Sequence, residues 1–343
     1  RDMFYDGNQA YEPGAIVARV APSFLRFGNF EMLASRNEIQ NLTSLVDWTI
    51  DRFYPHIKGE NKIIAWFKEV VGRTAFLITE WLRVGFVHGV MNTDNMSILG
   101  VTIDYGPYSF LDDYDPNFTP NTTDLPGRRY AFGRQAAVAK WNLSCLAGAI
   151  APLLSGEEEL IEALNSYDAI YWKSYYTMMA NKTGLDKPGP GDAAFFELLE
   201  KTLSNVKPDM TLFYQLLATL SVDQQNEQDI MDHFQEAFYG APDPAQKEGF
   251  LTFIRTYLER IKTNSCTRED AVKRMNETNP RFILRNYLLH QAIEELERGE
   301  NTLFVKLEDA IRHPYSRDAD EFFVKRPTWA TQKAGCSMLS CSS

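Results

Sequence analysis

The chain has 343 residues, of which 44% are hydrophobic and 13% aromatic, values typical of a globular protein. This is more than most single cores hold, so we expect one large domain or two packed lobes. The formal net charge of −11 argues against broad nucleic-acid binding, which needs clustered Lys and Arg. Uninterrupted apolar runs stay below the roughly 18 residues of a membrane span, so we expect no span.

The first segment combines a predicted strand with two arginines. Residues 15–20 are mostly apolar and precede Pro22, which predicts a strand that ends there. Arg19 lies inside this run, and Arg26 follows shortly after it. Surface positions are the ordinary interpretation of both, but an arginine inside an apolar run needs an anionic partner. The chain starts at Arg1 without methionine, and we expect it to be a fragment of a longer protein.

Helical periodicity dominates the rest of the chain. Apolar residues at helical spacing predict long helices over 38–54, 62–87 and 134–153. A further stretch, 156–295, is helical in pattern, with Gly and Pro breaks at 184–191, 208 and 242–244. From about residue 314 the periodicity is lost.

The stretch 84–107 concentrates more potential ligand chemistry than any other part of the sequence. Its polar residues include His88, Asn92, Asp94, Asn95 and Asp104. Eight residues separate Asn95 from Asp104, which predicts two short strands that turn at Leu99–Gly100. Such a hairpin would bring both side chains to one end, where two oxygen ligands suit a hard divalent ion such as Mg²⁺. Asp94 would point elsewhere and could accept a proton from an attacking hydroxyl.

The order of these residues favours a functional loop over an ordinary polar turn. Protein kinases carry His-Arg-Asp-x-x-x-x-Asn and then Asp-Phe-Gly, in which the Asn and the second Asp hold metal. His88 and Asn95 have the same offset here, and Asp104-Tyr-Gly replaces Asp-Phe-Gly. We therefore predict an α+β, protein-kinase-like fold, mostly the helical C-lobe, with a short β-hairpin at the metal site.

The sequence departs from the kinase pattern in two places. Val90 occupies the position of the usual catalytic Asp, which leaves Asp94 as the nearest carboxylate. Residues 1–40 contain neither a Gly-rich phosphate loop nor a Val-Ala-Ile-Lys strand. Either these parts belong to a missing N-terminal segment, or the chain binds ATP poorly.

Several motifs together resemble the selenoprotein O family, in the same order and over nearly the whole chain. They are Tyr11-Glu-Pro-Gly-Ala, Arg19-Val-Ala-Pro-Ser-Phe-Leu-Arg26-Phe-Gly, His88-Gly-Val-Met-Asn-Thr-Asp94-Asn95-Met, Asp104-Tyr-Gly-Pro-Tyr and Asn279-Pro-Arg-Phe-Ile-Leu-Arg-Asn286-Tyr. The family's members look like pseudokinases but transfer AMP from ATP to protein hydroxyls, with the nucleotide flipped. The resemblance implies ATP as substrate, Mg²⁺ or Mn²⁺ as cofactor, and protein substrates bearing Ser, Thr or Tyr hydroxyls.

The resemblance also implies roles for individual residues. Asp94 matches the proton acceptor, whereas Asn95 and Asp104 match the metal ligands, with Asp104 also close to the nucleotide. Arg19 and Arg26 match arginines that contact ATP, which would give Arg19 its anionic partner. The family's Gly-rich loop and nucleotide-contacting Lys would precede this chain. A conventional protein kinase and an inactive pseudokinase scaffold are the alternatives.

The resemblance divides the chain into three parts. Residues 1–30 would end the N-lobe, 31–313 would form the helical C-lobe with the active site, and 314–343 would form the tail. Cys341 occupies the place of selenocysteine in many animal members and suggests a redox role. A Cys336–Cys341 disulfide and an unpaired flexible tail are equal alternatives. We expect a mitochondrial location in a eukaryote and a cytoplasmic one in a bacterium.

Overall fold

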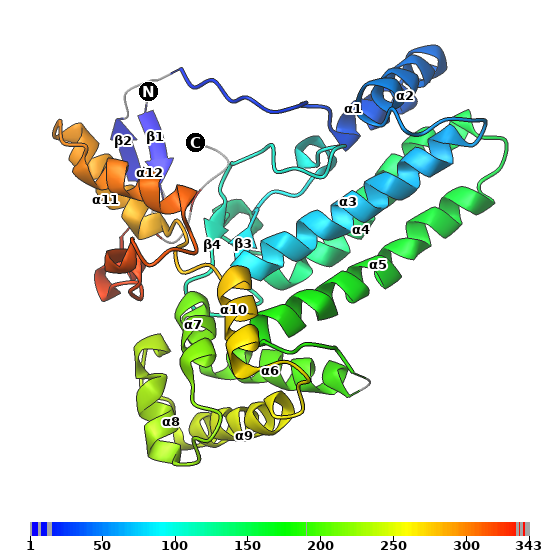
Figure 1. Cartoon of the computed structure of the whole chain (residues 1–343). Helices are drawn as coiled ribbons and strands as arrows, with labels where there is room; N and C mark the ends of the chain where they lie inside the picture. Colours follow the sequence, from blue (N-terminus) through cyan, green and yellow to red (C-terminus); the bar gives the residue numbers. More distant parts are fainter. Residues whose placement is uncertain are drawn as a thin grey trace.

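The computed structural model describes residues 2–5, 8–11, 16–189 and 191–333, together with Cys336 and Leu339. The described chain is mostly helical, with short antiparallel strand pairs (Figure 1). The strands are β1 (Asp2–Tyr5) paired with β2 (Asn8–Tyr11), and β3 (Phe86–Val87) paired with β4 (Ser109–Phe110). The helices are α1 (Phe27–Ser35), α2 (Ile39–Phe53), α3 (Lys62–Val84), α4 (Gln135–Ile150), α5 (Glu158–Thr183), α6 (Asp192–Val206), α7 (Met210–Thr219), α8 (Glu227–His233), α9 (Pro244–Ile261), α10 (Arg268–Thr278), α11 (Asn286–Glu297) and α12 (Thr302–Arg312). The predicted α+β composition is confirmed at this level.

The centre of the molecule is a layer of three long helices, α3, α4 and α5, which pack against one another (Figure 1). Their inward faces carry fully buried side chains such as Trp66 and Phe67 of α3 and Leu143 of α4. Burying each large apolar side chain contributes about 1.5–3 kcal/mol relative to leaving it exposed. This layer is the rigid support for the loops at the end of α3.

The predicted helices are confirmed, with one shifted boundary. Helix α2 spans nearly the predicted range, and α4 continues into a short 3₁₀ turn, Ala151–Leu153. Helix α3 ends earlier than predicted, because Gly85 takes the left-handed conformation (φ 78°) that terminates helices. The next two residues then pair with β4 as strand β3.

The apolar stretch Phe132–Leu153, which contains α4, has the length and composition of a membrane span. Its side chains nevertheless belong to the main core, where Leu143, Leu146 and Ile150 are fully buried. The apolar character of α4 is therefore explained by its central place among the helices.

The predicted strand over residues 15–20 is wrong for the residues that the structure describes there. Residues 16–20 have no regular secondary structure, and Ile16, Val17 and Val20 are 103%, 86% and 93% exposed. A strand needs a neighbour that accepts and donates backbone hydrogen bonds, and no described segment pairs with this one. Local composition alone could not reveal whether such a neighbour exists.

The predicted hairpin between Asn95 and Asp104 is also wrong. Ser97 makes a single antiparallel bridge, and its partner is Arg26. The hydroxyl of Tyr54 donates to the Ile98 carbonyl at 2.6 Å, so α2 and its C-cap hold this segment from outside. The segment is therefore fixed by the surrounding helices, while the short β-ladder forms between β3 and β4.

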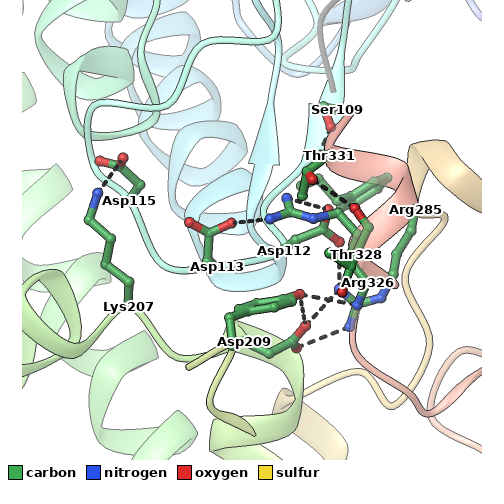
Figure 2. A network of polar contacts seen from close by, with 12 residues as sticks. Ser109, Asp112, Asp113, Asp115, Lys207, Asp209, Arg285, Arg326, Thr328 and Thr331 are labelled. Carbon is green, nitrogen blue, oxygen red and sulfur yellow. Dashed lines mark hydrogen bonds and ion pairs between the residues drawn. The ribbon is translucent and has the colours of Figure 1, made fainter. Parts of the chain in front are cut away.

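Helices α11 and α12 build a second, smaller core with the segment that follows them, in which Phe282, Leu307 and Phe322 are buried. An ionic network joins this part to the main core (Figure 2). The guanidinium of Arg285, 3% exposed, lies 2.6 Å from Asp112 Oδ1 and 2.8 Å from Asp209 Oδ2. The predicted division at residues 30 and 313 stays a prediction.

Candidate active site

Two side chains of α4 hold the backbone that leaves α3. Gln135 Nε2 donates to the Phe86 carbonyl at 2.9 Å, and its Oε1 accepts from the His88 N–H at 3.0 Å. Asn142 Nδ2 donates to the Met91 carbonyl at 2.9 Å. Gln135 and Asn142 lie about two turns apart on α4 and therefore share one face. The sequence analysis did not single out either residue. A usable signal was present, because two amide side chains seven residues apart lie in a predicted helix that is otherwise mostly apolar.

Two further amides complete what we call the amide clamp, the set Gln135, Asn142, Asn121 and Asn95. Asn121 Nδ2 donates to the Gly89 carbonyl at 3.1 Å, and Asn95 Nδ2 donates to the Val90 carbonyl at 2.8 Å. Because the Asn95 nitrogen is used in this way, its Oδ1 is the atom left to accept from, or ligate, another group. The predicted ligand is therefore held with its oxygen available.

Gly89 is required by this arrangement. Its φ of 80° is a conformation that residues with a side chain rarely adopt. A Cβ at this position would lie 2.5 Å from the Pro107 carbonyl oxygen. The turn after His88 therefore packs directly on the segment that follows Asp104.

Asp94 lies against the first turn of α1. A Cβ built on Gly28 would lie 2.0 Å from Asp94 Oδ1 and 3.0 Å from its Cγ, so only glycine leaves room for this carboxylate. Asp94 is exposed. The dipole of a helix favours a negative charge beside its N-terminus, which is where the Asp94 side chain lies.

The backbone pairs the loop with the chain that enters α1. The Phe27 N–H donates to the Met96 carbonyl at 3.0 Å, and the Ile98 N–H donates to the Leu25 carbonyl at 3.1 Å. These bonds flank Arg26 and place it beside the loop of Asp94. The Arg26 Nε is buried and has no partner in the described part of the chain. Arg26 thus brings an unused donor close to this loop.

The structure brings Arg19 and Asp104 together. Arg19 Nη1 lies 3.9 Å from Asp104 Oδ1, with the two side chains 44% and 22% exposed. An ion pair of this length and exposure contributes little to stability. Arg19 is exposed, as the surface interpretation expected, and it contacts Asp104 only loosely, which leaves both groups able to bind other partners.

His88 is buried at the centre of the loop and is held neutral. Its Nδ1 accepts from the Val90 N–H at 3.3 Å, which assigns the ring proton to Nε2. Burial lowers the pKa of His88 from 6.5 to about 4, and the opposing charge of Asp104 raises it by less. Trp81 packs against the ring, with centroids 5.3 Å apart. A neutral, buried imidazole packed against Trp81 suits a structural role.

The oxygen ligands that the loop offers are few but suitable for a hard cation. No three His, Cys, Asp or Glu side chains gather in a metal-ligand cluster among the described residues. The predicted pair, Asn95 and Asp104, is a smaller set, and the Asn92 Oδ1 is buried without a partner among the described residues. Mg²⁺ commonly takes one or two protein oxygens and completes its shell with phosphate and water. In residue type these side chains fit a nucleotide-bound metal ion, while the joint ligation by Asn95 and Asp104, for which the predicted hairpin was the argument, stays a prediction.

The end of the chain returns to this region. Leu339 pairs with the loop beside Asn121: its N–H donates to the Pro120 carbonyl at 2.7 Å, and its carbonyl accepts from Thr122 at 2.8 Å. Cys336 is buried. Cys341 lies outside the described residues, so its predicted pairing with Cys336 stays a prediction.

The helical scaffold and its clamped loop thus present the oxygen ligands Asp94, Asn95 and Asp104. Arg19 and Arg26 add arginine donors. The model of one protein family, described as protein adenylyltransferase SelO, matches residues 2–312. The chain belongs to the SelO family, and the resemblance seen in the sequence is confirmed.

Curated relatives agree with this assignment. The protein nucleotidyltransferase YdiU of Cytophaga hutchinsonii is 58% identical over 343 residues, which cover 100% of this chain and 66% of the relative. Its counterpart from Aromatoleum aromaticum is 47% identical over 348 residues, which again cover 100% of this chain and 66% of the relative. The protein nucleotidyltransferase YdiU of Flavobacterium johnsoniae is 44% identical over 349 residues, which cover 100% of this chain and 67% of the relative. The chain thus spans about two thirds of the length of these relatives.

Proposed function

We propose that the whole protein is a protein adenylyltransferase, which transfers AMP from ATP to Ser, Thr or Tyr hydroxyls of protein substrates. The observation that carries this proposal is the placement of Asp94, exposed at the α1 N-terminus, while Val90 stands where a kinase has its base. Family membership and the nucleotidyltransferase relatives support the same reaction class. We infer that the helical layer is the C-lobe of a protein-kinase-like fold.

The reaction balances with the residues at hand. The substrate hydroxyl oxygen forms a bond to the α-phosphorus of ATP, the bond from that phosphorus to the bridging oxygen breaks, and pyrophosphate leaves. Asp94 accepts the hydroxyl proton. Arg26 and Arg19 contact the phosphates, for which Arg19 exchanges its loose contact with Asp104. Asn95 Oδ1 and Asp104 hold Mg²⁺ or Mn²⁺, which neutralises phosphate charge when bound.

Position-specific labels test the proposal directly. The full-length protein is incubated with a protein acceptor and ATP labelled at either the α- or the γ-phosphate. We expect label on the acceptor only from the α position, and none with Asp104→Ala. Label from the γ position alone would instead establish the runner-up, a conventional phosphotransferase.

A second arm tests the choice of nucleotide. The relatives are named for nucleotidyl transfer without a specified base. All four α-labelled ribonucleoside triphosphates should therefore be compared at equal concentration, with ATP expected to be the best donor. If another nucleotide is the better donor, the protein is still a nucleotidyltransferase, but its nucleotide substrate is not ATP. The relatives named above are bacterial, and for a bacterial source we infer a cytoplasmic location.

A further inference from the structure

A partly open cavity lies away from the candidate active site. Between α5, α6 and α7 there is a cavity of about 380 Å³, whose lining includes none of the predicted site residues. Ligand pockets commonly start at about 300 Å³, so this space is large enough for a small organic molecule. Its wall is rich in buried phenol rings, contributed by Tyr114, Tyr171, Tyr175 and Tyr214.

One carboxyl group faces these rings. Glu200 of α6 lines the cavity and accepts a hydrogen bond from the Tyr175 hydroxyl. Burial raises the pKa of the Glu200 carboxyl, and no basic side chain forms an ion pair with it within residues 16–189 and 191–333. Glu200 is half-buried, and a carboxylate withdrawn from water is ordinarily matched by a cation. The cavity therefore contains an acid without a counter-ion.

Lys182, the buried lysine of the cavity wall, is already engaged elsewhere. Its Nζ donates to the Arg83 carbonyl at 2.7 Å and lies 3.8 Å from the centroid of the Tyr214 ring. Burial is the main cause that lowers the pKa of this lysine well below its ordinary value. Lys182 is thus held by a carbonyl and a ring and does not neutralise Glu200.

The aromatic side chains that line the cavity also pack against one another. Tyr171 and Tyr175 have centroids 5.8 Å apart at an interplanar angle of 31°. Trp172 meets Tyr175 nearly at a right angle, 84°, with centroids 5.5 Å apart. Trp172 lines the cavity and is 49% exposed. Aromatic rings and a carboxylate that line the same space are the usual chemistry for an organic cation.

We propose that this cavity binds a small organic ammonium ion of the quaternary ammonium class, with Glu200 as its counter-ion and the tyrosine and tryptophan faces as its cage. A neutral molecule of the same shape leaves Glu200 unpaired and gains no cation–π attraction. Binding should therefore depend on the positive charge more than on the apolar shape.

Choline and its uncharged carbon isostere, 3,3-dimethyl-1-butanol, separate charge from shape. Both are titrated into the purified chain by calorimetry, with chloride matched. We expect heat of binding for choline and none for the isostere. Glu200→Gln keeps an acceptor for Tyr175 and should weaken choline by about tenfold or more. The control Glu159→Gln removes an exposed carboxylate of α5 outside the cavity lining and should change the choline affinity less than about twofold.

Three results would overturn the proposal: no binding of choline at tens of millimolar, equal binding of choline and the isostere, or unchanged choline affinity in Glu200→Gln. The melting temperature of each variant is measured first. If Glu200→Gln does not fold, Tyr171→Leu replaces it, because loss of a cage face must also weaken choline relative to the isostere.

Discussion

Two polar regions of this molecule solve the same problem, fixing a loop, with different chemistry. The amide clamp holds the backbone from Phe86 to Met91 with uncharged donors and acceptors. The ionic network around Arg285 holds the segment after β4 with full charges that neutralise one another (Figure 2). Neutral restraint uses neither the charge of Asp94 nor that of Asp104, whose one ion pair among the described residues is the loose contact with Arg19. The paired charges around Arg285, by contrast, contribute to holding the fold together.

The ionic network also includes Arg326 and Tyr239, which engage its carboxylates, while Arg326 Nε is buried without a partner in the described part of the chain. Arg326 Nη1 lies 3.1 Å from Asp112 Oδ2, and its Nη2 lies 3.2 Å from Asp113. The Tyr239 hydroxyl donates to Asp209 Oδ2 at 2.7 Å, while Asp209 Oδ1 also accepts from the first turn of α7. Carboxylates paired in this way have little charge left for chemistry. The comparison therefore predicts opposite phenotypes for carboxylates in the two regions.

The largest effect should come from the exposed carboxylate of the candidate site. We expect Asp94→Asn to lower turnover by roughly 10²–10⁴-fold, the usual contribution of a general base. The melting temperature and the affinity for ATP should change little, because Asp94 is exposed. Steady-state transfer rates and nucleotide titration measure the two effects. Equal losses in turnover and in ATP binding would argue against a base role.

Breaking the ionic network should instead unfold the protein. Arg285→Met leaves Asp112 and Asp209 without their buried partner, which costs about 3–5 kcal/mol. Denaturant unfolding measures this loss. Arg255→Met is the matched control, since the exposed Arg255–Glu227 pair should contribute less than about 1 kcal/mol. If both variants lose a similar free energy of unfolding, the buried ion pairs of Arg285 are no more important for stability than the exposed pair of Arg255.

The buried His88 makes stability depend on pH. Its folded pKa of about 4 lies below the 6.5 of the free side chain, so the unfolded chain binds more protons between these values. Stability is therefore full above pH 6.5 and falls as pH drops toward 4, by about 3 kcal/mol from this group. His88→Asn, whose amide oxygen can still accept from Val90, should flatten the unfolding free energy across this range. An unchanged slope would contradict the burial argument.

The smallest effect should follow from loosening the amide clamp. Gln135→Leu leaves the Phe86 carbonyl and the His88 N–H unsatisfied, which costs about 1–3 kcal/mol. The transfer rate should fall more than the stability loss explains, because Asn95 depends on the same loop. The control is Gln246→Leu, an exposed amide that also bonds a backbone carbonyl far from the loop. A normal rate in folded Gln135→Leu would show that the clamp does not position the site.

Local sequence patterns predicted the helical part of the fold. Helical periodicity and Gly or Pro breaks predicted the helices well, because both depend on residues a few positions apart. The order of His88, Asn95 and Asp104 indicated a kinase-like pattern, and several motifs in the same order over nearly the whole chain indicated the family. Pairing of strands did not follow from pattern: residues 16–20 have no described partner, and the predicted hairpin is replaced by helix contacts.

The sequence by itself determined the helical framework, the family and the identity of the candidate ligands. Only the tertiary structure decided how these groups are held: Gln135 and Asn142 reach the loop from nearly fifty residues away, Gly28 makes room for Asp94, and Arg19 meets Asp104. The physical reason is that such contacts join residues whose separation along the chain has no fixed period. They form only when the packed helices have brought distant backbone and side chains together.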